Sequence, residues 1–179
     1  MKGLAALAIL AAICCADTRV NPDAAIVGDF LKRIADYEQM VKTLDNKLPR
    51  LTTTGSQAAI EEHQHALANA IREARRNAKA GEIFSPQIST EFRRLIGIAM
   101  QGDAPRIHKS LQDSEPVQFQ LKVNDVYPSG VPRQSTPPTL LMNLPALPQD
   151  LVYRLVGTTL ILLDNRANLV VDLMSNAIR

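Results

Sequence analysis

The sequence of 179 residues is poor in the side chains on which several classes of function depend. It contains no tryptophan, three tyrosines and four phenylalanines. Proteins use exposed aromatic rings to stack on bases and sugars, so this scarcity disfavours nucleic-acid and carbohydrate stacking sites. Lys and Arg number 20 against 18 Asp and Glu, and the formal net charge of +2 gives no field that would attract a polyanion. We therefore expect no nucleic-acid partner.

Cysteine is confined to two adjacent positions, Cys14 and Cys15. They follow Lys2 and an uninterrupted apolar run over residues 4–13, and they precede Ala16. A short positive start, an apolar run and small residues at its end are typical of a secretory signal peptide. The run is shorter than the roughly 20 residues that a transmembrane helix needs. The pattern predicts a signal peptide over residues 1–16, a periplasmic or secreted location, and no integral membrane protein.

Cleavage after Ala16 would leave a mature chain without cysteine, which would exclude disulfides, thiolate nucleophiles and Cys-bound metals. The alternative is a lipoprotein that is anchored to a membrane through Cys14 or Cys15. The residues that precede these two cysteines are Ile13 and Cys14, whereas a lipobox places Gly, Ala or Ser there.

Two long helices are predicted over residues 22–48 and 57–80, within a helical region that covers residues 17–113. The first has apolar residues at alternating steps of three and four, which is a heptad seam. The second has an alanine-rich stripe and Gly81 as a C-terminal cap. Because the lengths are similar and the connection is short, we expect a long antiparallel helical hairpin. The seam of the first helix consists of Val27, Phe30, Ile34, Tyr37, Val41, Leu44 and Leu48.

Shorter helices are predicted after the hairpin. Ser85-Pro86 has the order of a capping residue and a first helical proline, and Gly102 is expected to end that helix. Residues 104–112 then form a short fourth helix. The composition changes at Pro116, and residues 114–150 contain seven of the eleven prolines. This segment is interpreted as a proline-rich strap with one strand, residues 118–123, where apolar and polar residues alternate.

Residues 151–179 are predicted to form a β-meander. Strands are expected over residues 151–156, 159–164 and 169–174, joined by a two-residue turn at Gly157-Thr158 and a longer turn at residues 165–168. The middle run, residues 160–163, is apolar at every position, as expected of a central strand that is covered on both faces. The fold class is therefore α+β, with a small antiparallel sheet packed against the helices.

No motif predicts a catalytic, metal or cofactor site. The chain has neither a Gly-x-Ser-x-Gly elbow nor a glycine-rich phosphate loop. Glu61 and His65 share a helix face, but two ligands are too few for a zinc site. His63 falls at a seam position, and we expect it to form a hydrogen bond across the hairpin. We predict no metal and no cofactor.

Charged residues in the meander are the remaining candidates. Arg154 lies within an apolar strand and needs a carboxylate, which Asp164 or Asp172 would supply through a cross-strand ion pair. Alternatively, it is a cation that faces a ligand or partner beside Tyr153. The candidate partner-binding residues are thus Tyr153, Arg154 and Asp164. An acidic-residue hydrolase that uses Asp164 and Asp172 stays open as a second hypothesis.

The block that begins "FQLKVNDVYP" and ends "YRLVGTTLILLDNRANLVVDLM" resembles an uncharacterised family of exported bacterial proteins. Phe30, Arg33, Tyr37 and Leu44, with "ALANAIREAR" and "GEIFSP", are also similar to that family. The resemblance implies export, a helical N-terminal part and a C-terminal β-module, and it brings no activity. The last 22 of these residues also look like β-modules of periplasmic families, one of them associated with nickel and cobalt homeostasis, whose metal role is not carried over.

These observations predict an exported cell-envelope protein that acts as a non-catalytic binding or interaction module. Its partner is an unknown envelope protein or a second copy of the chain. The alternatives are the acidic-residue hydrolase and a periplasmic carrier of a small molecule or metal.

Overall fold

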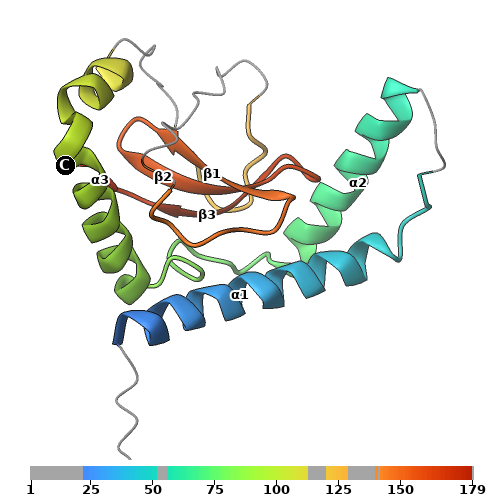
Figure 1. The fold of residues 1–179 in the computed structure, drawn as a ribbon. Coiled ribbons are helices and arrows are strands. Elements are labelled where there is room, and N and C mark those ends of the chain that lie inside the picture. The colour runs from blue at the N-terminus through green and yellow to red at the C-terminus, as the bar shows by residue number, and fades with distance from the viewer. Residues whose placement is uncertain (1–21, 52–55, 113–119, 129–139, 141, 179) are drawn as a thin grey trace, which may run out of the picture.

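A computed structural model describes residues 22–51, 56–112, 120–128, 140 and 142–178. The predicted signal peptide, residues 1–16, lies outside the described residues. The elements are α1 (Pro22–Asp45), α2 (Gln57–Ala74), α3 (Pro86–Gln112), β1 (Leu151–Val156), β2 (Thr159–Asp164) and β3 (Leu169–Met174). The helices surround a small sheet, with α1 beneath it and α2 and α3 on opposite flanks (Figure 1). The predicted α+β class is confirmed.

The sheet is antiparallel, and its strands follow the order β1-β2-β3. All three strands have the predicted bounds. Gly157 has a φ of +57°, which the first position of a two-residue hairpin turn requires and which glycine adopts without strain. The register shifts between Leu162 and Leu163, where a bulge interrupts the pairing of β2 with β3. Because side chains alternate along a strand, this register decides which residues face the helices.

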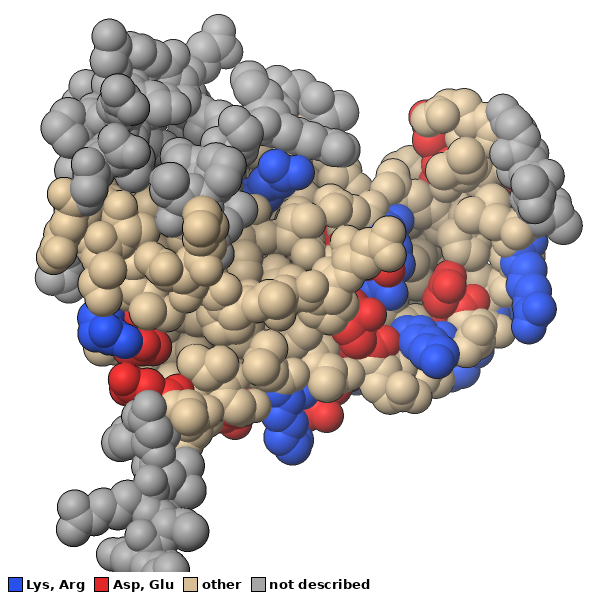
Figure 2. Space-filling model, viewed as in Figure 1, with Lys and Arg blue, Asp and Glu red and all other residues tan. Residues whose placement is uncertain are grey.

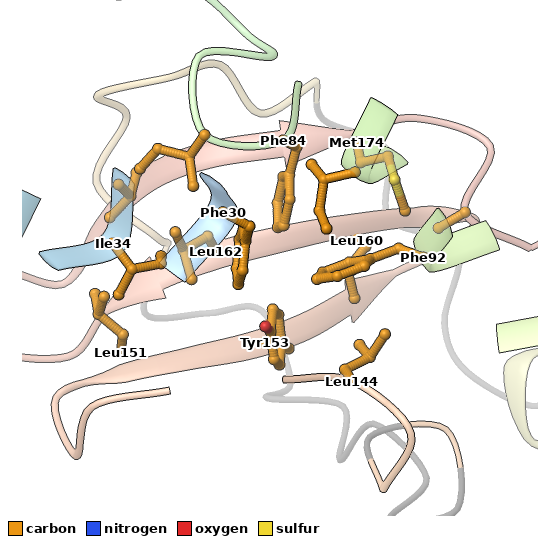
Figure 3. Packing of buried hydrophobic residues seen from close by; sticks show 14 of the residues in the cluster. Phe30, Ile34, Phe84, Phe92, Leu144, Leu151, Tyr153, Leu160, Leu162 and Met174 are labelled. Atoms are coloured by element: carbon orange, nitrogen blue, oxygen red, sulfur yellow. The ribbon is translucent and has the colours of Figure 1, made fainter. Parts of the chain in front are cut away.

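The helix-covered face of the sheet holds the main core. Phe30 of α1, Phe84 before α3 and Phe92 of α3 form a ring cluster, with Phe30 and Phe92 centroids 5.1 Å apart. Tyr153 of β1 meets Phe92 edge to face at 5.9 Å. Figure 3 shows these rings lying over the strands beside Leu160 and Leu162. The predicted apolar seam of α1 therefore packs on the sheet and on α3, as well as on α2.

The opposite face of the sheet carries a second, smaller cluster. Its buried members are Tyr127, Ile161, Leu163 and Val170. We call this side of the sheet the outer face. Residues 120–128 lie against it, so β2 is buried on both sides, as predicted for the run 160–163.

The predicted fourth strand does not form in residues 120–123, and residues 118–119 lie outside the described part of the chain. Instead, one isolated bridge joins Val126 to Leu169. A turn prevents longer pairing, because Asp125 N donates to Lys122 O and Asn124 adopts a φ of +69°.

The predicted long helical hairpin is not confirmed. α2 rises away from α1, so the two helices are close at one end only (Figure 1). α2 also ends at Ala74, before the predicted end at Ala80. In place of the predicted helical turns after Ala74, Arg75 makes tertiary hydrogen bonds. Its guanidinium donates to Val171 O, and its carbonyl oxygen accepts from Asn124 Nδ2.

The third helix starts at Pro86, as predicted, but it does not end at Gly102. It continues to Gln112, so the predicted short fourth helix is the last part of α3. A glycine weakens a helix interior by only about 1 kcal/mol relative to alanine, which is too little to end a helix by itself. No helix within the described ranges has the length and apolar character needed to cross a membrane.

Candidate functional site

Asp172 is fully buried on the helix-covered face and acts as an anchor for the backbone. Its Oδ2 accepts hydrogen bonds from the N–H groups of Ile83 and Phe84, each at 2.7 Å, and its Oδ1 accepts one from Gly81 at 2.8 Å. Gly81 has a φ of +90°, a conformation that other residues rarely adopt. The carboxylate therefore fixes the chain that leads from α2 into α3.

Asp164 is the second buried carboxylate, and it faces α1. Tyr37 Oη donates to its Oδ2 at 3.0 Å, and Arg166 pairs with the same oxygen at 3.1 Å. Arg166 also pairs with Glu38 at 2.8 Å, which ties the β2–β3 turn to α1. Burial, followed by the charge of Asp164, raises the pKa of Tyr37. Burial lowers the pKa of Arg166, but the neighbouring carboxylates outweigh it and the net direction is upward.

These contacts give both aspartates structural roles. Each carboxylate is fully buried, and each already accepts several hydrogen bonds. A general acid or base must reach the proton that it transfers in the substrate, and neither group is open to solvent. The acidic pair of the hydrolase hypothesis is therefore without support from the geometry.

Tyr153 and Arg154 lie on opposite faces of the sheet. Tyr153 is buried among the phenylalanines, and its hydroxyl donates to Pro145 O at 3.1 Å. Arg154 is half-buried and pairs in register with Ile161 of the outer face. Asp164 and Asp172 point to the helix-covered face, so the predicted ion pair between Arg154 and either of them does not form. The three candidate partner-binding residues are not brought together.

Arg154 is instead left with an unsatisfied donor. Its Nε is buried and has no hydrogen-bond acceptor among the residues that the structure describes. Other arginines of this fold donate to backbone carbonyls: Arg72 to Asn124 O, Arg75 to Val171 O and Arg93 to Asn176 O. Arg72 and Arg75 thereby join the C-terminal end of α2 to distant parts of the chain.

The histidine-rich stretch of α2 does not assemble a metal site. Within the described residues, no three His, Cys, Asp or Glu side chains come close enough to hold an ion. Glu61 and His65 are exposed, and Glu61 accepts a hydrogen bond from Gln57. His63 Nε2 lies 2.8 Å from Asp45 Oδ1, so the predicted hydrogen bond between the first two helices is confirmed.

A pocket of about 290 Å³ lies where the end of α1 and the start of α2 separate. His63 is on its wall, and the pocket combines apolar surface with one acidic and one basic side chain. Figure 2 shows this end of the molecule, where Lys or Arg side chains lie next to Asp or Glu side chains. The lining residues are Pro49, Arg50, Leu51, Ala59, Glu62, His63 and Ala66. We call this the α1–α2 pocket.

A second pocket of about 430 Å³ opens on the outer face, next to the β1–β2 hairpin. We call this the outer-face pocket. Its floor is aliphatic, and hydroxyl and amide groups surround it. The lining residues are Gln120, Leu121, Val156, Gly157, Thr158, Thr159, Ile161, Leu173 and Ser175.

No protein-family model, curated protein or solved structure matches this chain. The resemblance to an uncharacterised exported family therefore stays a prediction.

Sequence reasoning missed both pockets. The sequence did contain a signal for the face of the sheet on which Arg154 lies. A two-residue turn at Gly157-Thr158 pairs Val156 with Thr159, and counting back from there pairs Arg154 with Ile161. Since Asp164 is three positions from Ile161, the alternation of a strand places it on the other face. Nothing local marks Arg50, Leu51 or Glu62 as pocket residues.

Proposed function

We propose that the protein is an exported, non-catalytic interaction module of the cell envelope that binds a partner protein at the α1–α2 pocket. The observation that supports this most directly is the pocket itself, in which exposed apolar side chains lie beside charges of both signs. The envelope location rests on the sequence pattern of residues 1–16.

The size of the pocket favours a protein side chain over a whole small molecule. Small-molecule sites are usually about 300–1,000 Å³ and enclose most of the ligand. At about 290 Å³, the α1–α2 pocket is at the lower limit of that range. Protein interfaces concentrate their binding energy in a few anchor side chains that insert into such pockets.

The surrounding side chains define what the partner should present. Leu51 and Ile60 are 44% and 45% exposed, so they offer apolar surface at this end of the molecule. Arg50 and Glu62 line the pocket with opposite charges, and Asp45 fixes the His63 ring. An amphipathic helix with one large apolar anchor between charged residues fits this chemistry.

Two leucine substitutions test the proposal as a matched pair. A photoreactive residue at position 59 should give one adduct of discrete mass in cells, and the captured protein should then be purified. Leu51→Asp should weaken the binding of the captured protein, measured by calorimetry, by about tenfold or more, since a carboxylate would replace an apolar contact. Leu31→Asp is the control, because Leu31 is similarly exposed, at 41%, and lies in the N-terminal half of α1, outside the pocket lining.

Three outcomes contradict this proposal. The first is the absence of any discrete adduct, and the second is equal weakening by both substitutions. The third is an adduct of twice the chain mass, which would replace the partner protein by a second copy.

The export part of the proposal has its own test. The intact mass of the protein from cell fractions should correspond to a chain that starts at Asp17. A chain that retains residues 1–16 would contradict export, and added acyl mass on a cysteine would establish the anchored form.

A further inference from the structure

The outer-face pocket and Arg154 lie on the same side of the sheet. Arg154 and Ile161 are directly opposite each other on β1 and β2, and Ile161 lines the pocket. Opposed residues on neighbouring strands have Cβ atoms about 5 Å apart. Val156, two positions after Arg154 on the same face of β1, also lines the pocket. Arg154 is not itself a lining residue, but its side chain starts from the strand position next to two residues that are.

Within the described residues the Nε of Arg154 has no acceptor, and this distinguishes Arg154 from the arginines that hold the fold together. Leaving a buried donor without an acceptor is unfavourable, and a charged donor more so. A carboxylate pairs with guanidinium through two parallel N–H···O bonds, one of which uses Nε when the approach is from the side. Nε itself is covered, so side-on pairing requires a rotation of the partly exposed Arg154 side chain.

The pocket supplies the second half of a recognition element. Val156, Ile161 and Leu173 provide aliphatic surface, and the hydroxyl-bearing residues lie around them. A volume of about 430 Å³ is within the range of small-molecule sites. An aliphatic chain can occupy this surface while its charged end reaches Arg154.

We propose that the outer face of the sheet binds a medium-chain alkyl carboxylate, with the chain in the outer-face pocket and the carboxylate on Arg154. This site is separate from the α1–α2 pocket, and it does not depend on the partner protein. Binding requires no covalent step.

Octanoate is a suitable probe, and it is titrated into the purified full-length protein by calorimetry. Octanol tests the chain without the charge, and acetate tests the charge without the chain. Octanoate should bind at least about tenfold more tightly than either of them, since only octanoate makes both contacts. Equal binding of octanoate and octanol would overturn the proposal, as would no octanoate binding at millimolar concentration.

Substitutions then locate the site. Arg154→Met should weaken octanoate binding by about 10- to 100-fold, because it removes a charge-assisted hydrogen bond. Arg76→Met is the matched control, because Arg76 is exposed on the α2 side of the molecule. This variant should bind octanoate as tightly as the unchanged protein does. Leu173→Trp keeps Arg154 but fills the pocket, so it should also abolish binding.

Unchanged binding in either Arg154→Met or Leu173→Trp would overturn the proposal. Thermal unfolding checks that each variant folds. If Leu173→Trp does not fold, the smaller change Thr159→Leu on the pocket wall replaces it with the same expectation.

Discussion

The two faces of the sheet differ in how completely their polar groups are satisfied. On the helix-covered face, Asp164 and Asp172 are fully buried and each accepts several hydrogen bonds. On the outer face, Arg154 has a buried Nε without an acceptor among the described residues. The helix-covered face also holds the ring cluster, whereas the buried residues of the outer cluster, within the described ranges, are Tyr127, Ile161, Leu163 and Val170.

This difference separates structural from functional candidates. Charged residues that the sequence marks as unusual become anchors where the fold supplies partners, as it does for both aspartates. A charged residue that the fold leaves unsatisfied, beside a cavity, is where binding of an external group becomes favourable. The unusual charge in a strand is therefore informative only after its face is known.

Adjacent leucines on β2 compare the packing of the two faces most directly. Leu162 belongs to the helix-covered core and Leu163 to the outer cluster, and both are almost fully buried. Leu162→Ala should destabilise the protein by about 4–5 kcal/mol, because the surrounding rings cannot close the cavity. Leu163→Ala should cost about 2–3 kcal/mol, since the smaller cluster relaxes more easily. Urea unfolding measures both, and equal losses would contradict the difference between the faces.

Removal of the charge of Asp172 tests whether its anchoring role is real. Asp172→Asn should destabilise the protein by about 3 kcal/mol, because an amide cannot accept as many bonds from Gly81, Ile83 and Phe84. Asp36→Asn on the exposed face of α1 is the control and should change stability by less than about 0.5 kcal/mol. A small effect of Asp172→Asn in the same denaturant experiment would show that other contacts hold the chain between α2 and α3.

Two tyrosines sharpen the comparison within the helix-covered face. Tyr37 donates to the charged Asp164, and Tyr153 donates to the neutral carbonyl of Pro145. Tyr37→Phe should therefore cost about 1.5–3 kcal/mol, and Tyr153→Phe about 0.5–1.5 kcal/mol. Chemical denaturation of the two variants ranks them, and the reverse order would mean that the remaining donors, from Arg166 and Ala167 N, satisfy Asp164 without Tyr37.

The pH dependence of stability should include a small contribution from Glu91. A hydrogen bond from Arg94 holds the pKa of Glu91 below its usual value. A carboxyl group with a lowered pKa in the folded state stabilises at pH values above its ordinary pKa, and this contribution disappears as the pH falls through the folded-state pKa. Glu91→Gln should thus lower Tm at pH 7 by no more than about 3 °C, and the difference should vanish in acid. A constant difference at all pH values would assign the effect to packing.

The smallest effect is expected on the outer face. Arg154→Met should leave the free energy of unfolding unchanged within about 0.5 kcal/mol, or raise it, since it removes a buried donor that has no acceptor in the described part of the chain. Arg75→Met is the comparison and should cost about 2 kcal/mol, because Arg75 bonds Val171 O and lies over the Tyr37 ring. Strong destabilisation by Arg154→Met would show that the guanidinium has a structural partner, and this would remove the reason for a ligand there.

Local patterns predicted the parts of the fold that depend on neighbours in the chain. The strand bounds follow from alternation and from Gly157 and residues 165–168 at the turns, and the start of α3 follows from Ser85-Pro86. The apolar seam of α1 was also visible, since Phe30, Ile34, Tyr37 and Val41 are buried. The element that packs against this seam was not predictable, because an apolar helix face can pack on another helix or on a sheet equally well.

The interactions that sequence reasoning missed join distant positions. Arg75 follows the last residue of α2 and donates to Val171 O, and Asp172 accepts from the N–H of Ile83. Neither pair has a local signature. The face of Arg154 was predictable from the turn, and the error came from treating proximity in sequence as proximity across the sheet.

The bond between Asp172 and Phe84 has a consequence for the order in which the protein acquires its structure. The two residues are separated by 88 positions, and Asp172 lies in the last strand. A ribosome delivers the N-terminal end first, so the bend between α2 and α3 lacks the hydrogen bonds to Asp172 until residue 172 has been synthesised. Truncation before residue 172 should therefore leave a collapsed, protease-sensitive chain, because no carboxylate is then present to accept from Gly81, Ile83 and Phe84.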